Sequence, residues 1–169
     1  MPERDHLVAA NETYADGFTK GDLPMPPARR LAIVTCMDAR LDPARCLGLE
    51  EGDAHVIRNA GGLVTEDAIR SLVISHWLLG TQEFAVVAHT DCGMLTFSND
   101  DLRSKLLEET GADASDVDFR PFPSLEESVR ESLRTIRESP LLPDGIEVSG
   151  WVYDVGCGRI TEVAEAAVA

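Results

Sequence analysis

Hydrophobic positions divide the chain into short apolar runs and longer segments in which apolar and polar residues alternate with a helical period. Two runs, Leu31–Cys36 and Glu83–His89, are almost wholly apolar and rich in β-branched residues. This composition is typical of strands that are covered on both faces of a sheet. Further strands are predicted at Ala54–Arg58 and Glu147–Asp154, with a short antiparallel return from Arg159 to Val163.

The segments between these strands predict helices, because each has helical periodicity or a recognisable start or stop signal. The predicted helices are a short one opened by Asp42-Pro43 and ending near Gly48, one capped by Thr65 over Glu66–Leu79, one from Asn99 to about Thr110, and one opened by a capping box at Ser124–Glu127. In the second of these, Ile69, Leu72 and Trp77 are among the residues expected to face the core.

This order of elements predicts an α/β fold with a mainly parallel central sheet flanked by helices and an antiparallel last strand. Residues 1–30 are interpreted as an N-terminal helical arm and a Pro-rich connector, and residues 31–169 as a single α/β domain. The arm has little of its own to pack on. We therefore expect it to lie on the main domain or on a second subunit.

Composition narrows the classes of partner. The chain has 169 residues, of which 44% are hydrophobic and 27% charged, so a globular domain is expected rather than a disordered one. Its formal charge of −15 disfavours binding to nucleic acid and to anionic lipid. No apolar leader and no long uncharged apolar stretch occur, so a cytoplasmic protein without a membrane span is expected.

Cysteine and histidine provide the candidate chemistry. His89 and Cys92 are three residues apart, and Cys36 lies at the end of another predicted strand. Ligands of open parallel sheets bind at the carboxyl ends of the strands, where Cys36 and His89 both fall. Thiolate and imidazole are preferred ligands of Zn²⁺, and a catalytic zinc site keeps one position open. The alternative is that Cys36 and Cys92 are inert buried thiols.

The segment Cys36-Met-Asp-Ala-Arg40 strengthens the catalytic interpretation. If strand geometry persists, Cys36, Asp38 and Arg40 point to the same side. A carboxylate at Asp38 can then reach a metal-bound water, and Arg40 can hold that carboxylate ionised through a bidentate pair. The alternative is an ordinary surface ion pair. Cys46 and Cys157 are interpreted as non-ligands.

Three motifs together resemble the β-class carbonic anhydrase family, namely C-M-D-A-R at 36–40, R-N-A-G at 58–61 and H-T-D-C-G at 89–93. The resemblance extends from about Leu31 to Val163 and includes a compact subgroup with carbonyl sulfide and carbon disulfide hydrolases. It implies that Cys36, His89 and Cys92 bind Zn²⁺ and that Asp38 and Arg40 form the catalytic dyad.

The resemblance also implies an activity and an assembly. Zinc-bound hydroxide would add to carbon dioxide and give bicarbonate, and some members of the family have an inactive state in which the aspartate itself binds zinc. A homodimer or homotetramer is expected. Carbonyl sulfide or carbon disulfide hydrolysis is the enzymatic alternative. A zinc-binding sensor of carbon dioxide or bicarbonate, or a thiol-based redox protein, is the non-hydratase alternative.

The sequence leaves two interpretations open for each of two further residues, His55 and Asp91. His55 can carry protons, because histidine titrates near neutrality, although a lone histidine on a strand is more often structural. Asp91 lies between two predicted ligands and either hydrogen-bonds behind them or caps their turn. Asn59 and Gly61 are expected to shape the backbone beside the site.

Overall fold

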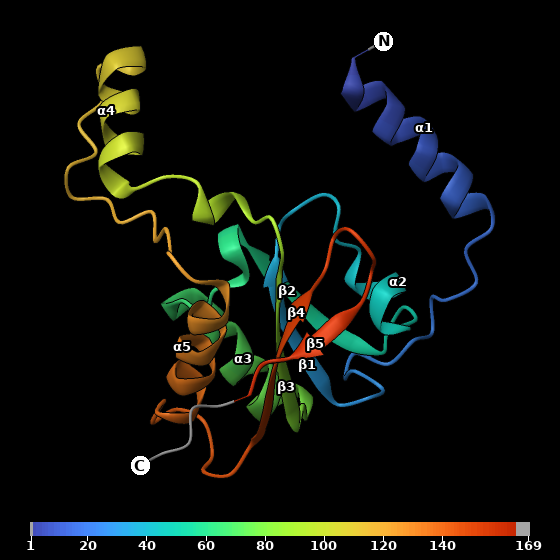
Figure 1. The fold of residues 1–169 in the computed structure, drawn as a ribbon. Coiled ribbons are helices and arrows are strands. Elements are labelled where there is room, and N and C mark those ends of the chain that lie inside the picture. Colours follow the sequence, from blue (N-terminus) through green and yellow to red (C-terminus); the bar gives the residue numbers. More distant parts are fainter. Residues whose placement is uncertain (1, 165–169) are drawn as a thin grey trace.

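A mainly parallel sheet forms the centre of the protein in a computed structural model that describes residues 2–164 (Figure 1). Within these residues the sheet has the strand order β2-β1-β3-β4-β5. The strands are β1 (Leu31–Cys36), β2 (Ala54–Asn59), β3 (Glu83–His89), β4 (Glu147–Tyr153) and β5 (Ile160–Glu162). The first four are parallel, and β5 pairs with β4 in the antiparallel sense. The predicted α/β fold class is confirmed.

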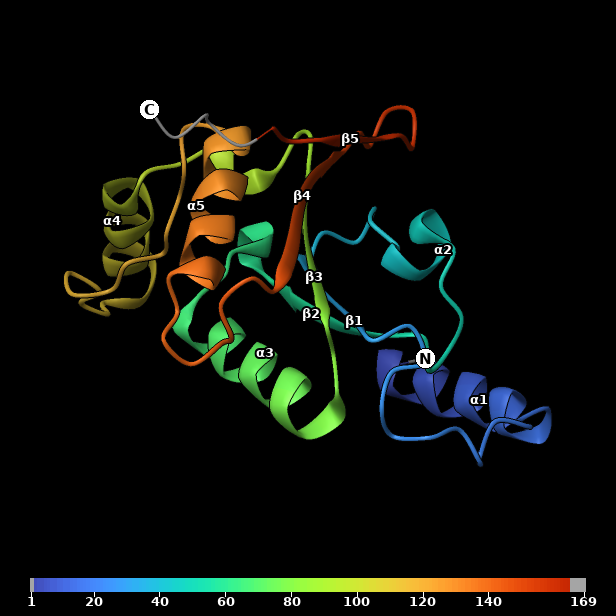
Figure 2. The same ribbon diagram turned by 90° about the horizontal axis from the view of Figure 1, so that it is seen from below.

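Helices lie on both sides of this sheet, as the two views show (Figures 1 and 2). The helices are α1 (Glu3–Asp16), α2 (Pro43–Leu47), α3 (Glu66–Leu79), α4 (Asn99–Thr110) and α5 (Leu125–Arg137), with short 3-10 turns η1 (Ala60–Gly62) and η2 (Gly93–Leu95). In Figure 2, α3 and α5 cover one face, and α2 lies on the opposite side.

Two apolar cores follow from the alternation of side chains along the strands. Ala32 and Val34 of β1 belong to the larger core, and Ile33 between them belongs to the smaller core on the opposite face. The larger core also contains residues from β3, α3 and α5, among them Leu72, Phe84, Val86, Val129, Leu133 and Ile136. Because both faces of β1 and β3 are packed, these two strands are fixed in position between the layers.

The N-caps predicted for three helices are formed in the structure. Asp42, Thr65 and Ser124 each accept a hydrogen bond from a backbone N–H three residues later, so all three are N-caps. At Ser124 only this half of a capping box is formed, whereas Ser98 and Asp101 form a complete one at the start of α4.

The inward position predicted for Trp77 is wrong. This side chain is 60% exposed, and its Nε1–H donates to the carbonyl oxygen of Leu141 at 2.9 Å. Ile69 and Leu72 are buried as predicted. Trp77 lies near the end of α3, where the hydrogen bond to the segment before β4 holds the indole at the surface.

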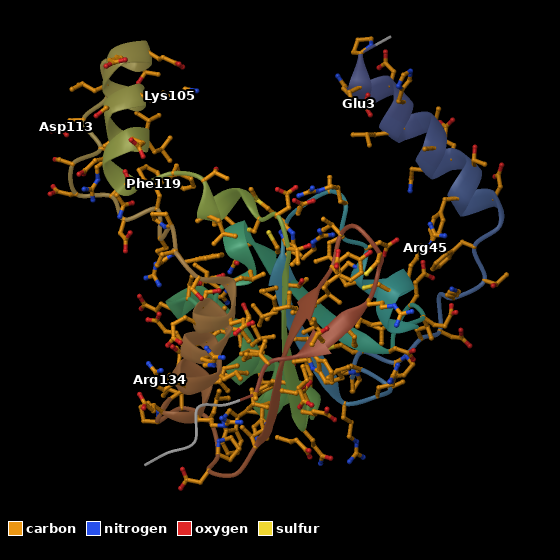
Figure 3. All side chains as sticks on the ribbon, in the orientation of Figure 1. Glu3, Arg45, Lys105, Asp113, Phe119 and Arg134 are labelled. Carbon is orange, nitrogen blue, oxygen red and sulfur yellow. The ribbon has the colours of Figure 1, made fainter. Side chains whose placement is uncertain are left out.

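Two helices contribute no buried residue to the core. None of the residues Glu3–Asp16 of α1 and none of the residues Asn99–Thr110 of α4 is buried. Both helices stand apart from the sheet in Figure 1, and Figure 3 shows the side chains around them, with Glu3 labelled on α1 and Lys105 on α4. Among the described helices, none is long and apolar enough to cross a membrane.

One glycine controls how closely the chain approaches the end of β1. Gly62 in η1 has a φ of +66°, and a Cβ there would lie 2.8 Å from the backbone nitrogen of Cys36 and 2.9 Å from the carbonyl carbon of Thr35. Both atoms belong to backbone held in the sheet, so they have little freedom to move. Only glycine therefore allows η1 to pack directly against the strand end that carries Cys36.

We expect Gly62→Ala to lower the free energy of unfolding by about 3 kcal/mol, because it combines left-handed backbone strain with a clash against the sheet. Gly80→Ala is the matched control, since Gly80 also has a positive φ of +76° but nothing within 4 Å of an added Cβ. Gly80→Ala should lower the free energy of unfolding by only about 1 kcal/mol, because it adds backbone strain without a clash. Urea denaturation of both variants measures the difference, and equal losses would contradict the close approach.

Candidate metal centre

The carboxyl ends of β1 and β3 bring the predicted ligands together. The two strands are adjacent and parallel, with Thr35 opposite Val87, so Cys36 and His89 lie at the same edge of the sheet. Cys92 follows in the turn after β3. The ligand atoms of the three side chains all lie within 4.8 Å of one another, and all three residues are buried. Within residues 2–164, no other histidine, cysteine or carboxylate group of three has this geometry.

His89 has one partnered ring nitrogen and one without a partner. Its Nδ1 lies 2.9 Å from the carbonyl oxygen of Thr90, which assigns the proton to Nδ1 as the donor. Its Nε2 is fully buried and has no hydrogen-bond partner among the described residues. Leaving such a nitrogen unsatisfied costs about 1–3 kcal/mol. A metal ion bound to Nε2 would remove this cost. Histidines that bind a metal through one ring nitrogen usually donate the N–H of the other to a carbonyl or carboxylate, as Nδ1 does here.

The two thiols differ in how easily they ionise. Burial raises the pKa of Cys36, but the neighbouring His89 ring and the backbone N–H groups of Asp38 and Gly61 outweigh it and lower the pKa to about 7. Burial raises the pKa of Cys92, and the nearby Cys36 raises it further. Thiolates are the metal-binding form of cysteine, and a cation between the two sulfurs stabilises both as thiolates. The sulfur, nitrogen and sulfur donors therefore fit a metal such as zinc.

Asp38 and Arg40 form a bidentate pair beside this group. Arg40 Nε donates to Asp38 Oδ1 at 3.0 Å, and Arg40 Nη2 donates to Asp38 Oδ2 at 2.8 Å. These bonds, with the Arg40 backbone N–H, hold the pKa of the Asp38 carboxyl well below its usual range. Asp38 Oδ2 also lies 3.7 Å from His89 Nε2. An ionised carboxylate thus lies at the edge of the candidate metal centre.

The geometry that produces this pair differs from the predicted one. Strand alternation does not continue past Cys36, because β1 ends there. Asp38 instead opens a turn in which its carbonyl accepts from the Leu41 N–H at 3.1 Å and its Oδ1 accepts from the Arg40 N–H at 2.8 Å. This turn, rather than a period of two, folds Arg40 back onto Asp38. A short side chain of Asp that bonds the backbone two residues on is a known turn former.

Arg58 had no predicted role, although it belongs to the R-N-A-G motif. Its Nε donates to the Cys36 carbonyl oxygen at 2.9 Å, and its Nη2 donates to the Asp38 carbonyl oxygen at 2.7 Å. Arg58 therefore fixes the backbone between a ligand and the dyad. Asn59 closes the next loop through two hydrogen bonds to Leu63, as expected of a residue that shapes the backbone.

The remaining sequence candidates lie outside the group or behind it. His55 bonds Ser75 Oγ at 2.7 Å, and Ser75 in turn bonds Thr81, so this histidine joins β2 to α3. Cys46 and Cys157 are not in the group. Asp91 accepts a hydrogen bond from Arg40 Nη1 at 2.6 Å, which places its carboxylate behind the dyad.

The chain is similar to known carbonic anhydrases over nearly its whole length. The carbonic anhydrase family profile matches residues 31–160. Beta-carbonic anhydrase 1 of Mycobacterium tuberculosis is 50% identical over 169 residues, which cover 96% of this chain and 99% of that protein. A crystal structure of carbonic anhydrase from Streptococcus mutans has a TM-score of 0.93 and 51% identity, covering 97% of this chain and 99% of that chain.

Relatives of lower identity include proteins named as hydrolases of carbon disulfide. Carbon disulfide hydrolase of Acidithiobacillus thiooxidans is 33% identical over 180 residues, which cover 95% of this chain and 90% of that protein. The predicted resemblance to β-class carbonic anhydrases is therefore confirmed, and so is the resemblance to the compact subgroup that includes carbon disulfide hydrolases. On the family profile and the identity over nearly the whole length, the chain belongs to the β-carbonic anhydrase family.

Proposed function

We propose that this protein catalyses the reversible hydration of carbon dioxide to bicarbonate, with a zinc ion held by Cys36, His89 and Cys92. One observation carries the proposal. Three buried ligand atoms lie within 4.8 Å of one another, and the ionised Asp38 carboxylate lies 3.7 Å from one of them. Membership of the β-carbonic anhydrase family supports the same activity.

Three protein ligands suit catalysis better than a structural role, because structural zinc sites are closed by four. Bound zinc would act as a Lewis acid that lowers the pKa of water towards neutrality. The protein supplies the other requirements of the reaction. The ion would be held by Cys36, His89 and Cys92 at two neighbouring strand ends, and Thr90 fixes the ring of His89 through its carbonyl oxygen.

Asp38 orients the attacking water. An ionised carboxylate only accepts hydrogen bonds, so the water must donate towards Asp38 and present a lone pair to the carbon of the substrate. Arg40 keeps Asp38 in this state by holding the pKa of the carboxyl low. A positioned nucleophile of this kind removes much of the entropic barrier to addition.

Apolar side chains adjoin the ligands. Met94 packs with Cys36 and Cys92, and Phe97 and Phe122 pack against this cluster. Such a lining suits a small uncharged substrate and limits the access of bulk water. Carbon dioxide, carbonyl sulfide and carbon disulfide share this linear uncharged form.

Hydrolysis of carbonyl sulfide or carbon disulfide is therefore the second candidate. The relatives named carbon disulfide hydrolase favour it, but their identities of 33 to 36% are lower than the 50% of the relative named beta-carbonic anhydrase. A zinc-binding sensor without turnover is less well supported. The Asp38–Arg40 pair would add nothing to a site that only binds metal.

We also propose that the protein is a homodimer or homotetramer in the cytoplasm. The exposed apolar side chains of Leu7, Val8, Tyr14 and Phe18 on and just after α1 support an assembly, because one chain leaves them without a core. The division into an arm of residues 1–30 and a domain of residues 31–169 remains part of this proposal.

Asp38→Asn should lower kcat/KM for carbon dioxide at least about 100-fold, because the neutral amide of Asn can donate as well as accept a hydrogen bond and no longer orients the water in one way. Zinc content should stay at the wild-type level, since Asp38 is not among the proposed ligands. Stopped-flow hydration with metal analysis measures both quantities. Parallel assays of sulfide release from carbonyl sulfide and carbon disulfide decide between the substrates, and a wild-type protein active only on these would overturn the hydratase assignment.

Removing the metal with a chelator should abolish hydration and lower the melting temperature by about 5 °C or more, because a ligand that binds only the folded state stabilises it. Cys92→Ala should reproduce both effects without chelator. Added Zn²⁺ should restore the chelated wild type but not the variant. Full hydration activity in metal-free protein would contradict the proposal.

Deletion of residues 1–25 should reduce the mass measured by sedimentation, because the exposed apolar face of α1 would no longer bind a second copy. Lys105→Ala on the equally exposed α4 serves as the control for a change on a projecting helix. If the mass of the assembly stays the same after the deletion, the chains must associate through a surface other than α1.

A further inference from the structure

Asp91 occupies an unusual position in the turn between two proposed ligands. It has a φ of +55°, in the left-handed region that residues other than glycine rarely adopt. Aspartate tolerates this conformation better than most residues. Its side chain is 76% exposed, so burial does not explain why the turn uses this residue.

Among residues 2–164, the carboxylate and the carbonyl oxygen of Asp91 both accept hydrogen bonds from one side chain, that of Arg40. Arg40 Nη1 donates to Asp91 Oδ2 at 2.6 Å, and Arg40 Nη2 donates to the Asp91 carbonyl oxygen at 2.9 Å. Arg40 also makes two side-chain bonds to Asp38. Four hydrogen bonds therefore hold a guanidinium group that has five N–H donors.

These bonds join two separate segments of the site. Asp38 and Arg40 follow β1, whereas Asp91 lies in the turn after β3 that carries His89 and Cys92. Nη2 of Arg40 bonds both sides at once, to Asp38 Oδ2 and to the carbonyl oxygen of Asp91. Asp38 thus holds the Nε–Nη2 edge of the guanidinium, and Asp91 holds the neighbouring Nη1–Nη2 edge.

Asp38 has an alternative position within reach. Its Oδ2, which Arg40 holds at 2.8 Å, lies 3.7 Å from the unpartnered Nε2 of His89. Arg40 is itself 48% exposed and would have many accessible rotamers if only Asp38 held it. A displaced Arg40 would leave the Asp38 carboxylate free to move towards the ligand atoms.

We propose that Asp91 is a positioning residue that fixes Arg40 and, through Arg40, keeps the Asp38 carboxylate out of the open position of the metal centre. This inference rests on the proposed zinc hydratase function. Asp91 does not touch the reacting atoms. It determines whether Asp38 orients the attacking water or competes with that water for the metal.

Two substitutions separate this role from support of the turn. Asp91→Gly removes the carboxylate, and glycine adopts a φ of +55° without strain, so the conformation of the turn is kept. Asp91→Asn keeps the shape and the tolerance of the left-handed conformation but loses the charge. Glu109→Gln is the control, because Glu109 is an exposed carboxylate paired with Lys105 on α4, at 3.8 Å.

We expect Asp91→Gly to lower kcat for carbon dioxide about tenfold with little change in KM, Asp91→Asn to lower it less, and Glu109→Gln to leave it unchanged. Zinc affinity, measured by competition with a chelator, gives the second readout. It should be equal to or higher than wild type in Asp91→Gly, because a released Asp38 adds a fourth ligand. In an Asp38→Asn background, Asp91→Gly should bring no gain in zinc affinity.

An unchanged kcat in Asp91→Gly would overturn the inference. So would a zinc affinity that falls together with kcat, since that result assigns Asp91 to support of the ligand turn. If the wild-type protein hydrates no carbon dioxide, the proposed function fails. The zinc affinities of the Asp91 and Asp38 variants would then still decide whether Asp91 restrains Asp38.

Discussion

The parallel pairing of β1 with β3 is the constraint on which the rest of the structure depends. It places Cys36 and His89 at one edge of the sheet, and each strand is packed on both faces, so the two strand ends cannot move apart independently. Two of the three ligands therefore owe their positions to the sheet, and all three ligand atoms lie within 4.8 Å of one another. The rigid sheet thus sets the ligand positions, and the turns after the strands add Cys92 and the Asp38–Arg40 pair.

The same arrangement has a cost in the metal-free chain. A buried imidazole nitrogen has no partner among the described residues, and two buried thiols lie close to each other. The unpartnered nitrogen is unfavourable without a cation, and the two thiols bind a cation only as thiolates. Gly62 and Arg58 belong to this arrangement as well, because one lets η1 approach Cys36 and the other fixes the carbonyl groups on either side of Met37.

The elements near the site could be predicted from local signals, because buried strands and capped helices have strong patterns. The strand Leu31–Cys36 and the helix Glu66–Leu79 have the predicted bounds. The contact between Arg40 and Asp91 could not be predicted, since it joins residues 51 positions apart through a turn that replaces strand geometry. Trp77 fits the apolar helix period, but a hydrogen bond to a distant segment holds it at the surface.

Exposure changes steeply across the site. His89 is fully buried, the Asp38 side chain is 19% exposed, Arg40 is 48% exposed and Asp91 is 76% exposed. Dissolved ions screen exposed charge pairs strongly and buried groups much less. The ionic strength of the surroundings therefore acts on the outer Arg40–Asp91 contact while leaving the ligand group largely untouched.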